Sequence, residues 1–160
     1  MIRRPPRSTQ SRSSAASDVY KRQCIIFTLA FKMINHVTQG IKVAVKESYY
    51  GSYFKNYRLH FSFNYFIKIT NQSKSIVQLK SRHWRIFDSL SPDIIIDGEG
   101  VIGQKPLIKP GESYEYSSSC LITSPVGAMR GFYNMINVNT GKNFRAYIPT
   151  FKLAAPQALN

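Results

Sequence analysis

The stretch Gly98-Glu99-Gly100-Val101-Ile102-Gly103-Gln104-Lys105-Pro106 decides which kind of fold this chain can have. Its Gly-x-Gly-x-x-Gly spacing is typical of dinucleotide sites, in which the last glycine leads into a helix whose free N–H groups hold a phosphate. Here Pro106, Pro110 and Gly111 follow Gly103 closely. Because proline and glycine disrupt helices, no stable helix is expected there, and the segment cannot be the usual dinucleotide loop.

On both sides of this stretch the chain reads as short strands. Apolar and polar residues alternate most clearly from Phe61 to Thr70, as in a half-buried strand, and the turn Asn71–Lys74 follows. Further strands are expected at Ile41–Lys46, Ile76–Phe87, Ile94–Ile96, Pro106–Lys109, Ser113–Ile122, Ala128–Val138 and Phe144–Leu153. Tyr49–Asn56, rich in Gly, Ser and Tyr, is expected to be a loop. The pattern predicts an all-β fold, an antiparallel β-sandwich of roughly seven or more strands.

The first 32 residues differ from the rest in composition. They hold seven basic side chains against one acid, which gives +6 of the net charge of +14. Their Ser- and Pro-rich sequence has no periodicity, so residues 1–32 are expected to be a disordered basic segment. Ser13–Gln23 is similar to translated sequencing-adapter sequence, so we interpret residues 1–32 as non-native and residues 33–160 as the folded domain. A basic targeting arm is the alternative.

The remaining composition limits the cellular setting. Basic residues after Met33 are scattered singly, which favours solvated strand faces over a nucleic-acid site, and no nucleic-acid partner is expected. No apolar run reaches the roughly 18 residues needed to cross a bilayer, so no membrane contact is expected. Cys24 and Cys120 give no disulfide framework. We therefore expect a reduced, cytoplasmic protein.

Several motifs occur together between Met33 and Asn160. They are Val77-Gln78-Leu79, Ser81–Trp84, Gly98–Gly103, Pro106, Pro110-Gly111-Glu112, Tyr116-x-Ser118, Pro125–Tyr133 and Ile148–Leu153. This combination resembles the ApaG domain family of bacteria, and the resemblance implies an immunoglobulin-like, fibronectin type III-like β-sandwich. Ser89-Leu90, Lys105 and Ser119 depart from the family pattern, which usually has Gly, Gln and Gly at these places.

The resemblance also carries expectations about function. It implies a possible link to cobalt and magnesium tolerance and a genomic context of diadenosine tetraphosphate hydrolysis. In eukaryotic relatives the same domain is a protein-binding module. The resemblance implies no catalytic residue and no cofactor.

The glycine segment is the first candidate ligand site. Gly98, Gly100 and Gly103 would present backbone N–H groups to a phosphate or a nucleotide polyphosphate, with Lys105 as a nearby cation. The alternative is that the glycines provide positive φ angles and close strand approach, and that Glu99 would repel an anion.

The segment Arg82-His83-Trp84-Arg85 has two interpretations, because neither face of the strand Ile76–Phe87 is purely apolar. It is either an exposed surface for a partner or part of a strand in which a bulge changes the buried face. We favour the bulge, with Trp84 as the core anchor and His83 as a structural hydrogen-bonding residue.

Catalysis and metal binding have little support in the sequence. Asp88, Asp93, Asp97 and Glu99 lie near one another in sequence and could form a carboxylate pair, but turn-forming roles explain them equally well. The three histidines lack metal-ligand spacing, and no Gly-x-Ser-x-Gly occurs. We expect no enzyme and no metal site.

The leading hypothesis is therefore a non-enzymatic module that binds a protein partner. Tyrosines supply contact area at little entropic cost, which makes an aromatic cluster the best candidate contact patch. The candidate contact residues are Tyr49, Tyr50, Tyr53, Phe54 and Arg82.

Overall fold

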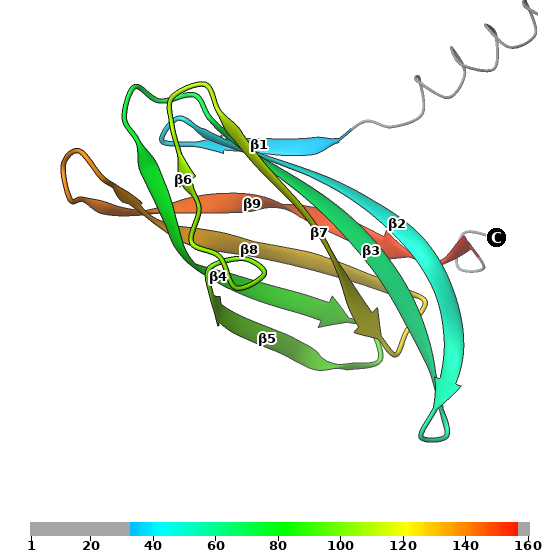
Figure 1. Cartoon of the computed structure of the whole chain (residues 1–160). Helices are drawn as coiled ribbons and strands as arrows, with labels where there is room; N and C mark the ends of the chain where they lie inside the picture. Colours follow the sequence, from blue (N-terminus) through cyan, green and yellow to red (C-terminus); the bar gives the residue numbers. More distant parts are fainter. Residues whose placement is uncertain (1–32, 157–160) are drawn as a thin grey trace, which may run out of the picture. The chain divides into compact units, whose positions relative to one another are not determined.

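The computed structural model describes residues 33–156; residues 1–32, for which we predict disorder, lie outside the described residues. Two antiparallel sheets pack face to face (Figure 1). The first sheet runs in the order β1 (Ile34–Thr38), β2 (Ile41–Lys55), β3 (Arg58–Asn71) and β7 (Ser113–Ile122). The second runs β5 (Ser91–Glu99), β4 (Val77–Asp88), β8 (Val126–Asn137) and β9 (Asn143–Ala154), and β6 (Leu107–Ile108) also pairs with β4. The predicted all-β sandwich is confirmed.

The core lies between the inner faces of the two sheets. In β3 the predicted alternation buries every second side chain from Phe61 to Ile69, and in β2 Ile41, Val43 and Val45 are buried together with the small Ala44. Trp84 of β4 is only 2% exposed and lies 5.4 Å from the ring of Tyr65 in the opposite sheet and 6.0 Å from that of Phe151. The single tryptophan therefore joins the two layers, as the sandwich interpretation predicts.

A bulge in β4 brings Trp84 to the inner face. Leu79 opposes Met135 of β8 while Ser81 opposes Asn134, so Lys80 is an extra residue in β4. Before the bulge the odd-numbered residues are buried, and after it the even-numbered ones are. The predicted change of face is confirmed, and it explains why the strand shows no single apolar face.

Gly131 of β8 lies directly opposite Trp84. A Cβ atom at this position would lie 2.1 Å from the backbone oxygen of His83 and 3.2 Å from Cε3 of Trp84. Only glycine fits there, because the backbones of β4 and β8 approach too closely for any side chain.

The prediction of a loop over Tyr49–Asn56 is wrong. β2 continues to Lys55 and pairs with β3 as far as Arg58, and the turn consists of Asn56 and Tyr57, with φ angles of 49° and 60°. Two central residues with positive φ match the right-handed twist of a two-residue hairpin. The strand escaped detection because both faces of this part of β2 are largely exposed, so burial imposes no alternation on its sequence.

The two long sides of the sandwich differ. On one side β1 and β2 contact β9, and the N–H of Tyr147 donates to Oγ1 of Thr38 at 3.2 Å. On the other side β7 and β5 are the end strands of their sheets. No helix within residues 33–156 has the length and apolar character to span a membrane.

Asp88 connects two turns near the ends of the core strands. Its carboxylate accepts the N–H of Leu90 at 3.1 Å, and both the N–H and the hydroxyl of Thr123, at 2.6 and 2.8 Å. Burial raises the pKa of this carboxyl, but the hydrogen bonds from Thr123, Ser124 and Leu90 together outweigh burial, so that the pKa falls below its ordinary value. The ionised form of Asp88 therefore stabilises the fold.

Replacing Gly131 tests the contact between β4 and β8. Gly131→Ala should lower the free energy of unfolding by about 1–3 kcal/mol or more, because the added methyl group meets backbone that cannot move aside. Urea unfolding followed by far-UV circular dichroism measures the change. Gly51→Ala is the matched control, since a Cβ there meets nothing within 4 Å. Equal stability of the two variants would contradict the close approach.

Stability should also depend on pH through Asp88. The folded-state pKa lies below the unfolded-state value, so the stabilisation is complete above the unfolded-state pKa and is lost as pH falls through the folded-state pKa. At neutral pH Asp88→Asn should lower the free energy of unfolding by about 1–3 kcal/mol. The difference from the wild type should shrink as the pH is lowered to about 3, and a difference independent of pH would exclude this role.

Candidate functional site

The glycine segment forms a tight turn between strands. Ile102 and Gly103 have φ angles of 49° and 72°. The N–H of Val101 donates to the carbonyl of Gln104 at 2.8 Å, and the N–H of Gln104 donates back to Val101 at 3.0 Å. These angles and hydrogen bonds are those of a two-residue hairpin turn, and no helix follows Gly103, as expected from the prolines.

The first two glycines allow close packing. A Cβ atom on Gly100, whose φ is 57°, would lie 2.0 Å from the carbonyl oxygen of Gln104. A Cβ atom on Gly98 would lie 2.9 Å from Cζ of Arg82, whose Nη1 donates to the carbonyls of Gly100 at 2.8 Å and Glu99 at 3.3 Å. Arg82 thus lies against the backbone at Gly98, where a side chain would displace only the end of the arginine, whereas Gly100 and Gly103 have positive φ angles that favour glycine.

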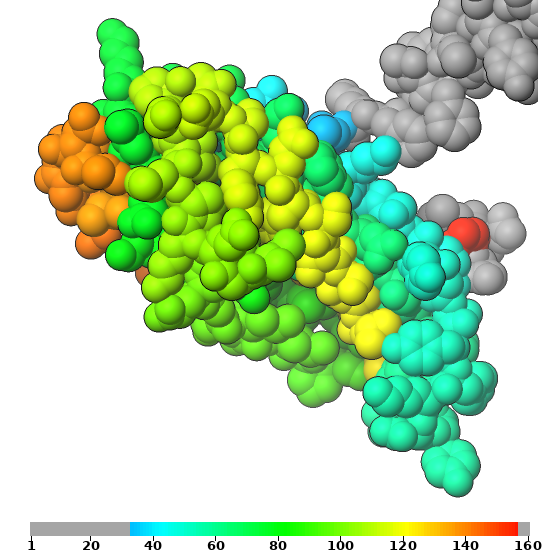
Figure 2. All heavy atoms as spheres, viewed as in Figure 1, coloured from blue at the N-terminus to red at the C-terminus, as the bar shows by residue number. Residues whose placement is uncertain are grey.

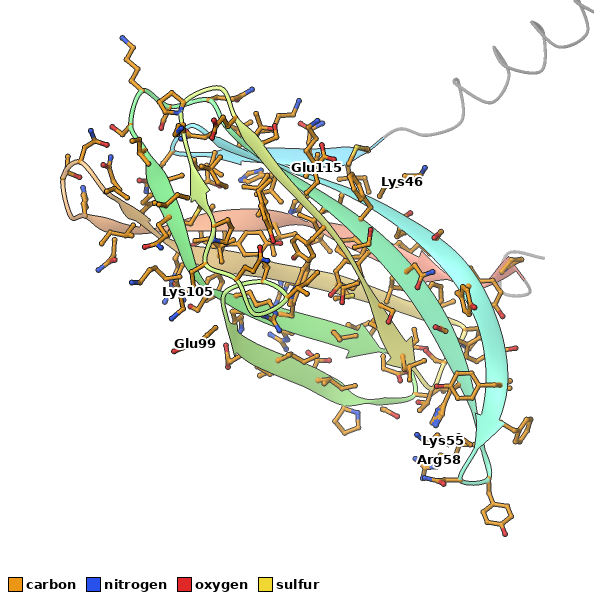
Figure 3. All side chains as sticks on the ribbon, in the orientation of Figure 1. Lys46, Lys55, Arg58, Glu99, Lys105 and Glu115 are labelled. Atoms are coloured by element: carbon orange, nitrogen blue, oxygen red, sulfur yellow. The ribbon has the colours of Figure 1, made fainter. Side chains whose placement is uncertain are left out.

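The electrostatics of this turn bear on the anion hypothesis. The N–H of Gly100 donates to the carbonyl of Lys80 at 2.8 Å, so it, like those of Val101 and Gln104, already has an acceptor. Nζ of Lys105 lies 2.8 Å from Oε2 of Glu99, and this hydrogen bond and charge lower the pKa of Glu99 (Figure 3). The loop therefore offers an incoming anion fewer donors than its sequence indicates.

The second candidate region is the end of the β2–β3 hairpin. β1 pairs with β2 only as far as Val45, and β7 pairs with β3 only from Phe61 onward. Residues 51–60 therefore form a two-stranded ribbon that pairs with no other strand within residues 33–156. Figures 1 and 2 show this cyan-green hairpin extending beyond the remaining strands.

The ribbon and the residue before it present several aromatic side chains to solvent. Tyr50 is 76% exposed, Phe54 75% and Tyr57 fully exposed, while Tyr53 contacts the ring of His60 at 5.9 Å. We call Tyr50, Tyr53, Phe54, Tyr57 and Leu59 the ribbon patch, which covers both faces of the hairpin end: Phe54 is the cross-strand partner of Leu59 on one face, and Tyr53 lies with His60 on the other. Tyr57 and Leu59 were not among the candidates from sequence; the positive φ that Asn tolerates at position 56 is the signal that could have located the turn.

Two of the predicted contact residues lie elsewhere. Tyr49 packs against the core and contacts Phe63 at 5.5 Å between ring centroids. Arg82 lies against the glycine turn, and Figure 3 shows that turn, at Glu99 and Lys105, well separated from the ribbon tip at Lys55 and Arg58. The five predicted contact residues therefore do not form one surface.

The four neighbouring carboxylates have separate partners. Asp88 binds the Thr123 turn, Asp93 pairs with Nε of Arg85 at 2.5 Å, and Asp97 pairs with Nδ1 of His83 at 2.6 Å. Glu99 pairs with Lys105 as described. His83 also stacks on Phe132, with 4.7 Å between ring centroids. Within residues 33–156, no three His, Cys, Asp or Glu side chains gather to hold a metal ion.

The structural account of the glycine turn can be tested by asparagine substitution, since asparagine tolerates positive φ. Gly103→Asn should change the free energy of unfolding by no more than about 1 kcal/mol, because nothing lies within 4 Å of its Cβ position. Gly100→Asn should lower the free energy of unfolding by about 2 kcal/mol or more, because its Cβ meets the backbone of Gln104. Thermal unfolding of both variants compares them, and similar losses would argue against this packing.

Known proteins show which family has this fold and these motifs. A model of the ApaG domain matches residues 51–137. A protein named ApaG from Anaeromyxobacter dehalogenans is 39% identical over 128 residues, which cover 80% of this chain and all of that protein. ApaG from Methylorubrum populi is 40% identical over 119 residues, 74% of this chain and 91% of its own length.

A solved structure agrees with these matches. The crystal structure of a Bordetella pertussis protein, provisionally called ApaA, superposes with a TM-score of 0.67 at 37% identity. The superposition covers 73% of this chain and 94% of that one. Sequence and fold lead to the same conclusion: the chain belongs to the ApaG domain family.

Proposed function

We propose that this ApaG domain is a non-enzymatic module that binds a protein partner through the ribbon patch. The supporting observation is the exposure of Tyr50, Phe54 and Tyr57 on a hairpin whose tip pairs with no further strand among residues 33–156. Large aromatic side chains dominate binding energy at protein interfaces, and a soluble surface rarely groups them without a function.

The charge of the ribbon indicates what kind of partner fits. Between Ser48 and His60 the chain carries Lys55 and Arg58 and no acid, a net charge of +2. Figure 3 shows both cations at the tip of the hairpin. The complementary partner surface is an apolar groove with acidic groups at its rim, which would accept the aromatic rings and pair with the two cations.

The anion-binding alternative has less support. Three N–H groups of the glycine turn donate to carbonyls, and Lys105 pairs with Glu99.

We also retain a cytoplasmic setting as part of the proposal. Cys120 is a free cysteine, in keeping with a reducing compartment, and burial raises the pKa of its thiol to about 12, so the thiol stays protonated at neutral pH.

Site-specific photocrosslinking can identify and test the partner. A photoreactive phenylalanine analogue at position 54 of the full chain, expressed in the source organism, should crosslink one protein, while the analogue at Leu90 should not. The affinity of the purified partner is then measured by calorimetry. Tyr50→Ser, Phe54→Ser and Tyr57→Asn together should weaken binding by roughly a hundredfold, since each removes an exposed anchor.

A matched control removes the same number of exposed apolar side chains elsewhere. Leu90, Ile102 and Leu107 are 72%, 64% and 58% exposed, and Leu90→Ser, Ile102→Asn and Leu107→Ser together should leave the affinity unchanged. Raised salt should weaken the wild-type complex through the Lys55 and Arg58 contribution. An equal loss in the two triple variants, or full affinity in the ribbon variant, would refute the proposal.

A further inference from the structure

We propose that the open side of the sandwich holds a binding site for a small carboxylate with an apolar chain. A cavity of about 350 Å³ lies between the two sheets, where β5 and β7 are the end strands. Ligand pockets commonly start at about 300 Å³, so the cavity is large enough for a small molecule. Figure 2 shows the green surface of β5 and the yellow surface of β7 on the two sides of this edge.

Trp84 lines this cavity and carries a buried polar group. Its indole Nε1 is buried and has no hydrogen-bond acceptor among residues 33–156. Cε3 of the ring faces Gly131 of β8, and the Trp84 side chain lines the cavity. A buried donor without a partner is rare, and the resonance of this N–H reports on changes in the cavity beside the ring.

Arg82 supplies a positive charge on the same inner face. Nη1 donates to two backbone carbonyls of the glycine turn, and no carboxylate pairs with this guanidinium among the described residues. Arg82 lines the cavity, and its charge partly offsets the burial that raises the pKa of Tyr65 and Tyr133. Because the Arg82 cation has hydrogen bonds but no counter-charge, the cavity favours an anionic group, and a planar carboxylate matches the guanidinium geometry.

The walls of the cavity favour an apolar body. Ile94 and Ile96 of β5 are 40% and 41% exposed, and Leu121 of β7 is 44% exposed, although all three line the cavity between the sheets. Met129 and Ile86 lie deeper. A ligand with an alkyl chain would cover the exposed isoleucines while its carboxylate reaches Arg82, so both parts of the site are used together.

The single tryptophan makes this proposal directly measurable in the full chain. Octanoate should produce a saturable shift of the only indole N–H resonance and a matching change in tryptophan fluorescence. Octanol, which lacks the charge, should bind roughly tenfold or more weakly, because it loses the charge-assisted hydrogen bond. Octylammonium should not bind, and inorganic phosphate should not shift the indole resonance.

Variants distinguish the contribution of the Arg82 charge to binding from effects on folding. Arg82→Met should reduce octanoate affinity to that of octanol, and Arg82→Lys should recover part of it. Arg85→Met removes the same charge from the outer face of β4 and should have no effect. Ile96→Phe, which fills the mouth, should weaken octanoate and octanol alike. If Arg82→Met does not fold, the affinities of the wild type for octanoate, octanol and octylammonium still show whether the site requires a negative charge on the ligand.

Three results would overturn the proposal. One is the absence of any saturable change up to about 10 mM octanoate, beyond the millimolar affinity expected of a weak site. The second is equal binding of octanoate and octylammonium, which would exclude Arg82 as the anchor. The third is an equal indole shift with inorganic phosphate, which would show a site for anions without an apolar part.

Discussion

The packing of Trp84 between the two sheets is the constraint on which the other features of this fold depend. A tryptophan at this place in β4 requires a one-residue bulge at Lys80, which brings the side chain to the inner face. It also requires glycine at position 131 of the neighbouring strand, where a Cβ would meet the backbone. In turn, the bulge directs Arg82 inward, against the glycine turn. One large side chain thus determines the register of β4, the composition of β8 and the placement of the turn at Gly98–Gly103.

Much of this architecture could be predicted from sequence, for physical reasons that differ between elements. β3 is buried on one face along most of its length, so apolar residues occupy every second position of its sequence from Phe61 to Ile69. The exclusion of a helix after Gly103 followed from the backbone properties of proline and glycine, which are local. The bulge in β4 was predictable because the mixture of apolar and charged residues on both faces fits no regular strand.

Other features needed three-dimensional contacts. Tyr49–Asn56, which leads to the tip of the ribbon, resembles a loop in sequence, because a hairpin that is exposed on both faces has no alternation of buried and exposed residues. The glycine motif gave no indication that Gly98 makes room for the guanidinium of Arg82, since these residues meet only through the pairing of β4 with β5. The aromatic contact residues were located in part, but Tyr49 faces the core and Arg82 belongs to a different region.

The position of β5 at the end of its sheet has a consequence for self-assembly. A strand with three consecutive isoleucines, Ile94 to Ile96, and free backbone groups along one side is a template for edge-to-edge aggregation. In this chain Pro92, the second residue of β5, has no N–H to offer, and Asp93 and Asp97 place negative charge on both sides of the isoleucines. Natural proteins protect such edges with the same devices. The pairs Asp93–Arg85 and Asp97–His83 therefore keep these acids in place as gatekeepers against fibre growth.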